Sequence, residues 1–495
     1  MLSKISLPMF RNALVVSVII LFGSCATGKY IPDKKLSQSQ LKEDYLFLKN
    51  ALELKHPSLY WYTTKDSMDE YFNHFFNQIK DSMCERDFAW NVVSPLLHNI
   101  RCGHTSVSMS KMYVHYYRNK KLPAFPLYFK IWNDTAVVFA NLNKDSTLMR
   151  GTIVKSINNI PLTSITDSIL LRLPIDGYGE NFNLIRAGAS FPYFHRNIFG
   201  IDSVYKVKFI NSSGDEEEKA IPVYRPAIKD TGKIKVPKTP VQKINKNLFY
   251  RSLAIDSNNI AVMEVNSFTS GNMRRFFRRS FRELRKKDIK YLILDIRNNS
   301  GGKVGLSTML TKYIIDKKFR VSDTTFAKAQ SLKPFTRHFK GGFFNNLQLY
   351  FSTHRGADGK FHMGYLERHF FKPKKKNHFN GKSYILIGGP TFSAASVFAG
   401  AVKGSTNVIL AGEETGGGWH GNNGIMIPAL TLPNSKLRIN FPLFRIVQFN
   451  HVPKNGMGVM PDILIETDYK AIKNGKDKKM RVIKEMILED MKTKL

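Results

Sequence analysis

The chain is poor in cysteine and in acidic residues. It has three cysteines in 495 residues, and 39 Asp and Glu against 75 Lys and Arg. Three cysteines are too few for a disulfide scaffold, so a chain of this length must fold around hydrophobic cores, in two or three domains. The sequence also lacks internal repeats, a P-loop motif and metal-ligand spacing. We therefore expect no cofactor and no metal.

The formal net charge of +36 needs a physical explanation. Basic clusters lie at residues 274–279, 286–287 and 372–376, the first interleaved with phenylalanines. Such a pattern is typical of nucleic-acid binding. It equally suits anionic lipid headgroups, lipopolysaccharide phosphates or acidic peptide ends, and solubility alone is the other interpretation.

The N-terminus resembles a bacterial lipoprotein signal peptide over residues 1–25. Lys4 and Arg11 precede an apolar run over 13–22 that is too short to span a bilayer. Phe22-Gly23-Ser24-Cys25 then resembles a lipobox, which predicts lipidation at Cys25. We expect an envelope protein held to the membrane by lipid, on the outer membrane facing the periplasm. Export argues against nucleic acid and leaves anionic envelope surfaces as candidate partners.

Lipidation of Cys25 would leave Cys84 and Cys102. An oxidising periplasm permits a disulfide between them, and two buried thiols are the other interpretation. The sequence leaves both open.

Three apolar runs in the C-terminal half each end in a glycine-rich turn. They occupy residues 291–302, 384–396 and 408–418. Buried strands that run into glycine loops predict an α/β core with its site at the strand ends. Paired glycines at 301–302 let backbone amides approach a ligand closely.

Ser393 lies between a strand-like run and a helix-like segment at 397–402. A serine at a helix start is commonly an ordinary N-cap. It can also be a nucleophile, because the free N–H groups of the helix lie where an oxyanion would develop.

Four sequence blocks favour the nucleophile over the N-cap interpretation of Ser393. LDIRNNSGG (294–302), TFSAAS (391–396), GEETGGG (412–418) and GVMPD (458–462) occur in the order seen in the tail-specific, or carboxyl-terminal processing, serine peptidases, which include the tricorn core proteases. The chain resembles this family over roughly residues 260–465. The resemblance implies a crotonase-like α/β core, usually carrying a PDZ-like domain, that hydrolyses peptide bonds near substrate C-termini. Together with the predicted export, it makes envelope proteins or peptides the expected substrates.

The resemblance also assigns candidate catalytic residues. It puts the nucleophile on Ser393 and makes Ser396 a helix residue. The branch that uses a lysine base is not expected, because Gly418 takes the lysine's place and no lysine lies between 413 and 423. The tricorn-like branch uses an N-terminal histidine, and Cys102-Gly103-His104-Thr105 resembles its DGHT element with cysteine for the acid.

His104 is therefore the predicted general base, since an imidazole titrates near neutral pH. His420, on the glycine loop, is the alternative. The resemblance puts Asn455 nearest the third triad position, where relatives have glutamate. An asparagine can orient an imidazole without stabilising its charge. Glu413 or Glu414 could replace it, or the enzyme could be slow or inactive.

The predicted oxyanion donors are the amides of Gly302 or Gly301 and of Ala394. Asp295 and Arg297, at the end of the first strand, are expected to pair structurally.

The predicted domains follow the chain in order. A helical domain with His104 covers 26–121, with helices near 41–56, 68–79 and 88–97. A PDZ-like domain of strands and turns covers 122–223, a basic linker 224–248, and the α/β core 249–475. An insertion at 315–381 is placed to act as a lid or substrate wall, and a charged helix covers 476–495.

Two functions follow from these residues. The first is a serine endopeptidase or carboxyl-terminal processing peptidase acting on peptides or proteins. The second is a catalytically inactive lipoprotein of the same fold that binds peptides, lipids or glycans. Ser393, the glycine pair and His104 favour the enzyme. Cys102 and the missing glutamate favour the binding protein.

Overall fold

The computed structural model describes residues 30–132, 134–143, 147–226, 251–269 and 272–493. The predicted signal peptide with Cys25 and nearly all of the predicted linker lie outside these residues. No helix in the described ranges is long and apolar enough to cross a membrane.

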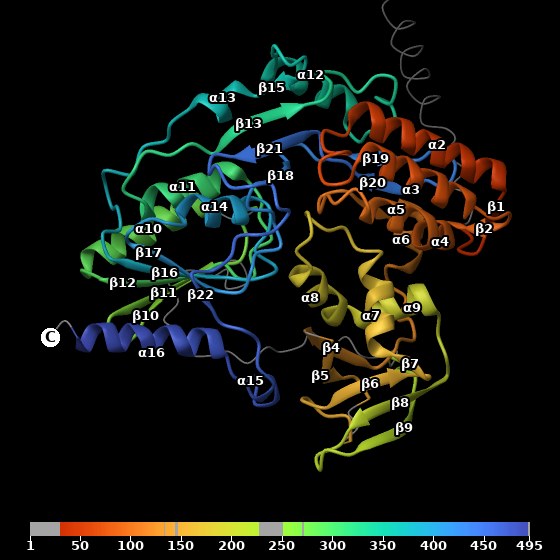
Figure 1. Ribbon diagram of the computed structural model, residues 1–495, viewed down its shortest axis with the longest axis horizontal. Coiled ribbons are helices and arrows are strands. Elements are labelled where there is room, and N and C mark those ends of the chain that lie inside the picture. The colour runs from red at the N-terminus through yellow and green to blue at the C-terminus, as the bar shows by residue number, and fades with distance from the viewer. Residues whose placement is uncertain (1–29, 133, 144–146, 227–250, 270–271, 494–495) are drawn as a thin grey trace, which may run out of the picture.

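A six-stranded sheet forms the centre of the C-terminal half (Figure 1). Its order is β10-β11-β12-β16-β17-β22, and every neighbouring pair except β10–β11 is parallel. The strands are β10 (Arg251–Ile255), β11 (Ile260–Val265), β12 (Tyr291–Asp295), β16 (Lys382–Ile387), β17 (Val408–Gly412) and β22 (Ile463–Leu464). All five residues of β12 are buried, as the continuous apolar run predicts.

Helices cover both faces of this sheet, because side chains alternate along a strand. Leu292 and Leu294 of β12 share a core with three helices, whereas Ile293 packs with the C-terminal helix. The three are α10 (Met273–Lys286), α11 (Val304–Ile314) and α14 (Ala394–Val402), and the C-terminal helix is α16 (Lys478–Lys492), preceded by the short α15 (Tyr469–Lys473). The charged helix expected from 476 onward is confirmed.

Arg297 ties α16 to the sheet. Its guanidinium donates to Asp295 Oδ2 at 3.0 Å and to both carboxylate oxygens of Asp477, just before α16. The structural pairing expected for Asp295 and Arg297 is thus confirmed.

The N-terminal segment is helical, as its apolar spacing predicts. Ser37 begins the first long helix with a reciprocal capping box that involves Gln40. The helices are α2 (Gln38–Lys55), α3 (Lys65–Asn77), α4 (Glu85–Phe88), the π-helical turn η1 (Ala89–Val93), α5 (Ser94–His98) and α6 (Lys111–Tyr117). A small ladder pairs β1 (Lys35–Leu36) with β2 (Met83–Cys84). The loop with His104 follows α5.

The next domain is mixed, which corrects the expectation of strands and turns alone over 122–223. Its sheet has the order β4-β5-β6-β8-β9, with β7 paired to β6. The strands are β4 (Leu127–Trp132), β5 (Thr135–Asn141), β6 (Ile153–Ile157), β7 (Ile160–Pro161), β8 (Val204–Ile210) and β9 (Glu216–Pro222). Three helices interrupt it: α7 (Leu162–Leu170), α8 (Asn181–Ala189) and α9 (Phe191–Phe199). Leu162, Ile165 and Ile169 recur at helical spacing and are buried, which explains α7.

Two further sheets connect distant parts of the chain. One has the order β14-β15-β13-β21-β18 and the other β19-β20-β3. The predicted insertion supplies β13 (Ser322–Ala327), α12 (Gly342–Ser352), β14 (His354–Arg355), β15 (Phe361–His362) and α13 (Gly364–Arg368). The remaining strands are β18 (Gly421–Gly424), β19 (Ala429–Thr431), β20 (Arg438–Asn440), β21 (Phe444–Gln448) and, from the N-terminal segment, β3 (Ser106–Ser108).

The strand β3 joins the N-terminal helices to the C-terminal half, since Val107 pairs with Ile439 of β20. Asp44 of α2 strengthens this junction by accepting the backbone N–H groups of Asn434 and Ser435, both at 2.7 Å. The loop with His104, immediately before β3, is therefore held against the α/β core.

Candidate active site

Ser393 lies at the turn between β16 and α14. Its backbone has φ 53° and ψ −126°, a conformation that costs a non-glycine residue free energy. Thr391 fixes the turn, because its hydroxyl donates to Ile296 O at 3.0 Å and accepts from the Gly388 amide at 3.1 Å. Ser393 is half-buried, so the turn presents its side chain at the end of the parallel strands.

The buried amide of Asn299 joins three loops at this edge of the sheet. Its Nδ2 donates to Val265 O at the end of β11, at 2.8 Å. Its Oδ1 accepts the Gly301 amide at 2.8 Å, and its backbone O accepts the Phe392 amide at 3.0 Å. One residue, through its side chain and its backbone carbonyl, thus sets the glycine turn against the serine turn.

Glycine is required at 301 because of this close approach. A Cβ atom there would lie 2.7 Å from Ser393 Cβ and 3.0 Å from the Ala394 nitrogen. On the other side, a Cβ at Gly417 would lie 3.0 Å from the Ser393 nitrogen. The glycines of two of the predicted loops therefore surround the serine.

The backbone amides at this turn that make no hydrogen bond within the described residues include those of Gly302 and Ala394. The Gly301 amide, in contrast, is bonded to Asn299 Oδ1. Ala394 is the first residue of α14, where helix N–H groups lack internal partners. Of the two glycines that the sequence offered, Gly302 therefore has the available donor.

His104 lies beside the serine turn. Its ring centroid is 4.8 Å from that of Phe392, the residue before Ser393. Burial lowers the pKa of His104 to about 4, so the imidazole is neutral at physiological pH. Its Nδ1 is buried and makes no hydrogen bond to any described residue. Within the described residues, His104 and Ser393 are not hydrogen-bonded to each other.

Asp176 is a component of the site that the sequence did not reveal. Its two carboxylate oxygens accept the amides of Gly103 and Gly418, each at 3.2 Å, and burial raises its pKa to about 6. The neighbouring Gly177 amide donates to Arg101 O at 3.1 Å. Asp176 thus connects the histidine loop to the glycine loop after β17. An isolated Asp in a Pro-Ile-Asp-Gly turn gives no signal of this.

The three candidates for the third triad member have other partners. Asn455 is exposed, and its Oδ1 accepts the Met457 amide at 3.0 Å. Glu413 forms an ion pair with Lys479 at 2.7 Å, and Glu414 accepts the Gly458 amide at 2.6 Å. Burial alone would raise the pKa of Glu413, but Lys479 outweighs it and lowers that pKa. None of the three is hydrogen-bonded to His104 within the described residues.

Other polar residues near the site have structural partners. Ser396 is buried, and its hydroxyl donates to Ser393 O at 2.8 Å, as expected for a helix residue. His420 is hydrogen-bonded through its Nδ1 to Val452 O at 2.8 Å, and its ring packs on Trp61.

Cys84 and Cys102 are both buried and unbonded to each other. Burial raises the pKa of Cys102 to about 12, so it is a neutral thiol. No group of three or more His, Cys, Asp or Glu in the described ranges could hold a metal ion.

The geometry defines a class of protein: an α/β fold that presents a serine at a strand-to-helix turn, with free amides and a neutral histidine beside it. Residues 259–465 match the family Peptidase_S41, peptidase family S41. Residues 259–465 of the chain therefore form a segment of the peptidase family S41 type. No curated protein sequence matches it.

Several solved structures resemble the chain in fold. The match to mature CPAF has 13% identity and a TM-score of 0.62, and it covers 88% of this chain and 94% of the CPAF chain. Mature CPAF complexed with lactacystin has 12% identity and a TM-score of 0.63, and the match covers 88% of this chain and 95% of that chain. At such identity the likeness shows the fold alone. The photosystem II D1 C-terminal processing protease has 15% identity and covers 88% and 96%, but its TM-score of 0.39 is too low for inference.

The strained backbone of Ser393 leads to a stability prediction. Ser393→Gly and Ser393→Ala both remove the hydroxyl, but only glycine adopts φ 53°, ψ −126° without steric cost. We expect Ser393→Gly to be more stable than Ser393→Ala by about 1 kcal/mol, since the strain of 1–3 kcal/mol outweighs the entropy cost of glycine. Urea unfolding of both variants measures the difference. An equal or lower stability of Ser393→Gly would contradict it.

Proposed function

We propose that this chain hydrolyses peptide bonds with Ser393 as nucleophile, His104 as general base, and the amides of Gly302 and Ala394 as oxyanion donors. The observation that carries the proposal is the close approach of Gly301 to Ser393, because it brings two free amides to a serine on a strained turn. Preorganised donors of this kind stabilise the oxyanion of a tetrahedral intermediate.

In the proposed reaction Ser393 Oγ attacks the peptide carbonyl carbon while the imidazole of His104 accepts the hydroxyl proton. The carbonyl oxygen becomes an oxyanion that receives hydrogen bonds from the two amides. His104 then returns the proton to the leaving amine, and the C–N bond breaks. Water, deprotonated by the same imidazole, hydrolyses the acyl-enzyme and regenerates Ser393.

Burial supports His104 in this role, since it keeps the imidazole neutral and able to accept a proton. Asp176 supports it indirectly: through the Gly103 and Gly418 amides it fixes the loop from which His104 extends. We further propose that Asn455 or a glutamate orients the imidazole only after substrate binding, because each now has another partner.

The finer features of the family belong to the same proposal. We assign the sheet β10–β22 to a crotonase-like core and the mixed domain at 127–222 to a PDZ-like module. Support for the second comes from a cavity of about 230 Å³ between β4–β5 and α7, lined by Ile131, Ala136, Leu162 and Thr166. An extended peptide could add to a strand edge there. Cleavage inside a chain and cleavage near a C-terminus are both compatible with this arrangement.

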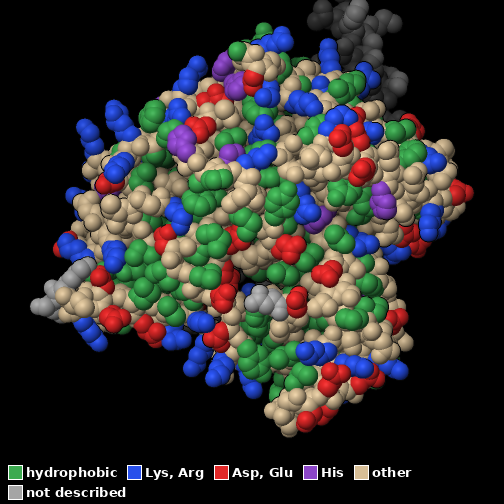
Figure 2. Space-filling model, in the orientation of Figure 1, with side chains coloured by type: hydrophobic (Ala, Val, Ile, Leu, Met, Phe, Trp, Pro, Cys, Tyr) green, Lys and Arg blue, Asp and Glu red, His purple; other side chains and the backbone are tan. Residues whose placement is uncertain are grey.

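We also propose that the protein is lipid-anchored at Cys25 to the outer membrane, on its periplasmic face. Aromatic residues of α12 support proximity to an apolar surface: Phe343, Phe344 and Phe351 are 70%, 72% and 76% exposed. Lys and Arg side chains are spread over the face in Figure 2 rather than gathered in one patch. The net charge therefore favours anionic envelope surfaces in general.

Labelling with a fluorophosphonate probe tests the proposed nucleophile and base. The purified wild type should be labelled, and Ser393→Ala and His104→Ala should each abolish labelling. Ser396→Ala and His420→Ala are matched controls that should be labelled normally, because their side chains have structural partners. A folded wild type that does not react would instead favour the inactive peptide-, lipid- or glycan-binding protein.

The low pKa of His104 predicts how labelling depends on pH. The base must be neutral, and with a pKa of about 4 it stays neutral well below the ordinary value near 6.5. The labelling rate should therefore hold down to about pH 5 and fall by half near pH 4, with folding followed by tryptophan fluorescence. If the Asp176 carboxyl, with its pKa of about 6, adds a second inflection to the labelling profile, Asp176→Asn should remove that inflection. A half-point near 6.5 would point to an exposed histidine as the base.

The predicted anchor has its own test in bacterial cells. The wild type should incorporate labelled palmitate and partition into detergent, whereas Cys25→Ala should do neither. Cys84→Ala is the matched control and should behave as the wild type. Incorporation that survives Cys25→Ala would place the lipid elsewhere.

A further inference from the structure

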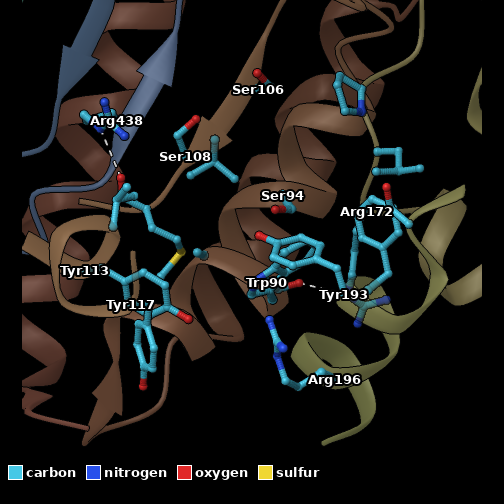
Figure 3. Close-up of a pocket in the computed structure, with 18 of the residues that line it drawn as sticks. Trp90, Ser94, Ser106, Ser108, Tyr113, Tyr117, Arg172, Tyr193, Arg196 and Arg438 are labelled. Carbon is cyan, nitrogen blue, oxygen red and sulfur yellow. Dashed lines mark hydrogen bonds between the residues drawn. The ribbon is translucent and has the colours of Figure 1, made fainter. Parts of the chain in front are cut away.

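A cavity of about 760 Å³ lies behind the histidine loop, in the range typical of ligand sites. Its walls come from the N-terminal helices η1, α5 and α6, from β3 and β20, and from the helices α8 and α9 of the mixed domain. Figure 3 shows Trp90, Tyr113, Tyr117 and Tyr193 facing this space together with several arginines.

The charge of this cavity has one sign. Its lining includes six cationic side chains and no Asp or Glu: Arg118, Lys120, Arg172, Arg186, Arg196 and Arg438. None of the six forms an ion pair with a described carboxylate. Burial lowers the pKa of Arg172 and of Arg186, as expected for desolvated cations that lack a counter-charge. An anion would therefore gain by entering.

Backbone carbonyls position the arginines but leave donors free. Arg172 donates Nε to Trp90 O at 2.9 Å, and Arg438 donates Nε to Met109 O at 3.0 Å. A guanidinium has five N–H donors in a planar fork that matches a carboxylate. The indole N–H of Trp90, 9% exposed, also has no acceptor among the described residues. The walls thus offer hydrogen-bond donors and aromatic surface.

One wall is the free edge of a strand. Among the described strands β3 pairs with β20 alone, so its other edge has no partner. Five consecutive residues, 105–109, line the cavity. Successive side chains point to opposite faces of a strand, so an uninterrupted run indicates that the cavity meets the edge and not one face. An edge with unpaired N–H and C=O groups can accept an extended chain.

The cavity is also adjacent to the candidate active site. Thr105, which lines it, directly follows His104, and Leu173 and Pro174 lead to Asp176. A chain that lies along β3 therefore extends toward His104 and Ser393.

We propose that this cavity binds an extended acidic peptide segment, which pairs with the free edge of β3 and places its carboxylates on the lining arginines, which include Arg118 after α6, Arg196 of α9 and Arg438 of β20. The role of this peptide as a substrate rests on the proposed function, whereas its binding in the cavity does not. The site selects peptides with acidic side chains on one side of the scissile bond.

Binding is tested with the full chain carrying Ser393→Ala, so that no turnover occurs. The probes are two fluorescein-labelled peptides of about ten residues, one alternating Val with Glu and the other Val with Gln. By fluorescence anisotropy the Glu peptide should bind at least tenfold more tightly. N-methylation of alternate amides in the Glu peptide should weaken it, because strand pairing is lost.

The double variant Arg118→Gln/Arg196→Gln should weaken the Glu peptide about tenfold and leave the Gln peptide unchanged. These side chains bear little of the fold: Arg118 is exposed, and Arg196 donates only to Pro123 O, at 3.5 Å. The matched control Arg278→Gln/Lys312→Gln removes the same charge from another basic cavity, beside α10 and α11, and should have no effect. Unfolding midpoints verify that each variant is folded.

Equal affinity for the two peptides would overturn the proposal. So would an equal loss in both double variants, because it would mean that the overall positive charge attracts acidic peptides. Tight binding of the Glu peptide by a protein that no fluorophosphonate labels would refute the proposed peptidase activity and leave the cavity assignment intact.

Discussion

The whole site depends on the parallel arrangement of β11, β12, β16 and β17. Parallel strands bring their carboxyl ends to one edge of the sheet, so the loops that follow them must share a small space. Their backbone polar groups need partners there, since water is largely excluded. Buried Asn299 satisfies groups from three of these segments, two through its side-chain amide and one through its backbone carbonyl. The position of Ser393 follows from that requirement.

The close approach of these loops explains where glycine and strain occur. Gly301 and Gly417 lie where any side chain would collide with the serine turn, and Ser393 itself adopts a backbone conformation that few residues tolerate. Natural sequences break local rules of this kind mainly at functional sites. Packing around the turn offsets the cost, with buried Thr391 on one side and α14 on the other.

Three distant segments meet around His104. Asp176, from the mixed domain, holds the Gly103 and Gly418 amides, and β3 is paired with β20. The histidine is therefore placed by interactions between domains and not by its own loop. The basic cavity lies at the same junction, so the proposed peptide binding there and the proposed chemistry at Ser393 depend on one supporting framework.

The sequence by itself determined the α/β core, the loops at its strand ends, and Ser393, because buried strands and glycine turns leave strong local patterns. The helices α2, α3, α10 and α16 were predictable for the same reason, through their apolar spacing. Only the tertiary structure decided the rest. The role of Asp176, the partners of Asn455 and Glu414, the helices α7 to α9, and the unpaired arginines of the cavity depend on contacts between residues far apart in the chain. Such contacts follow from packing and from the satisfaction of buried polar groups, which local pattern does not encode.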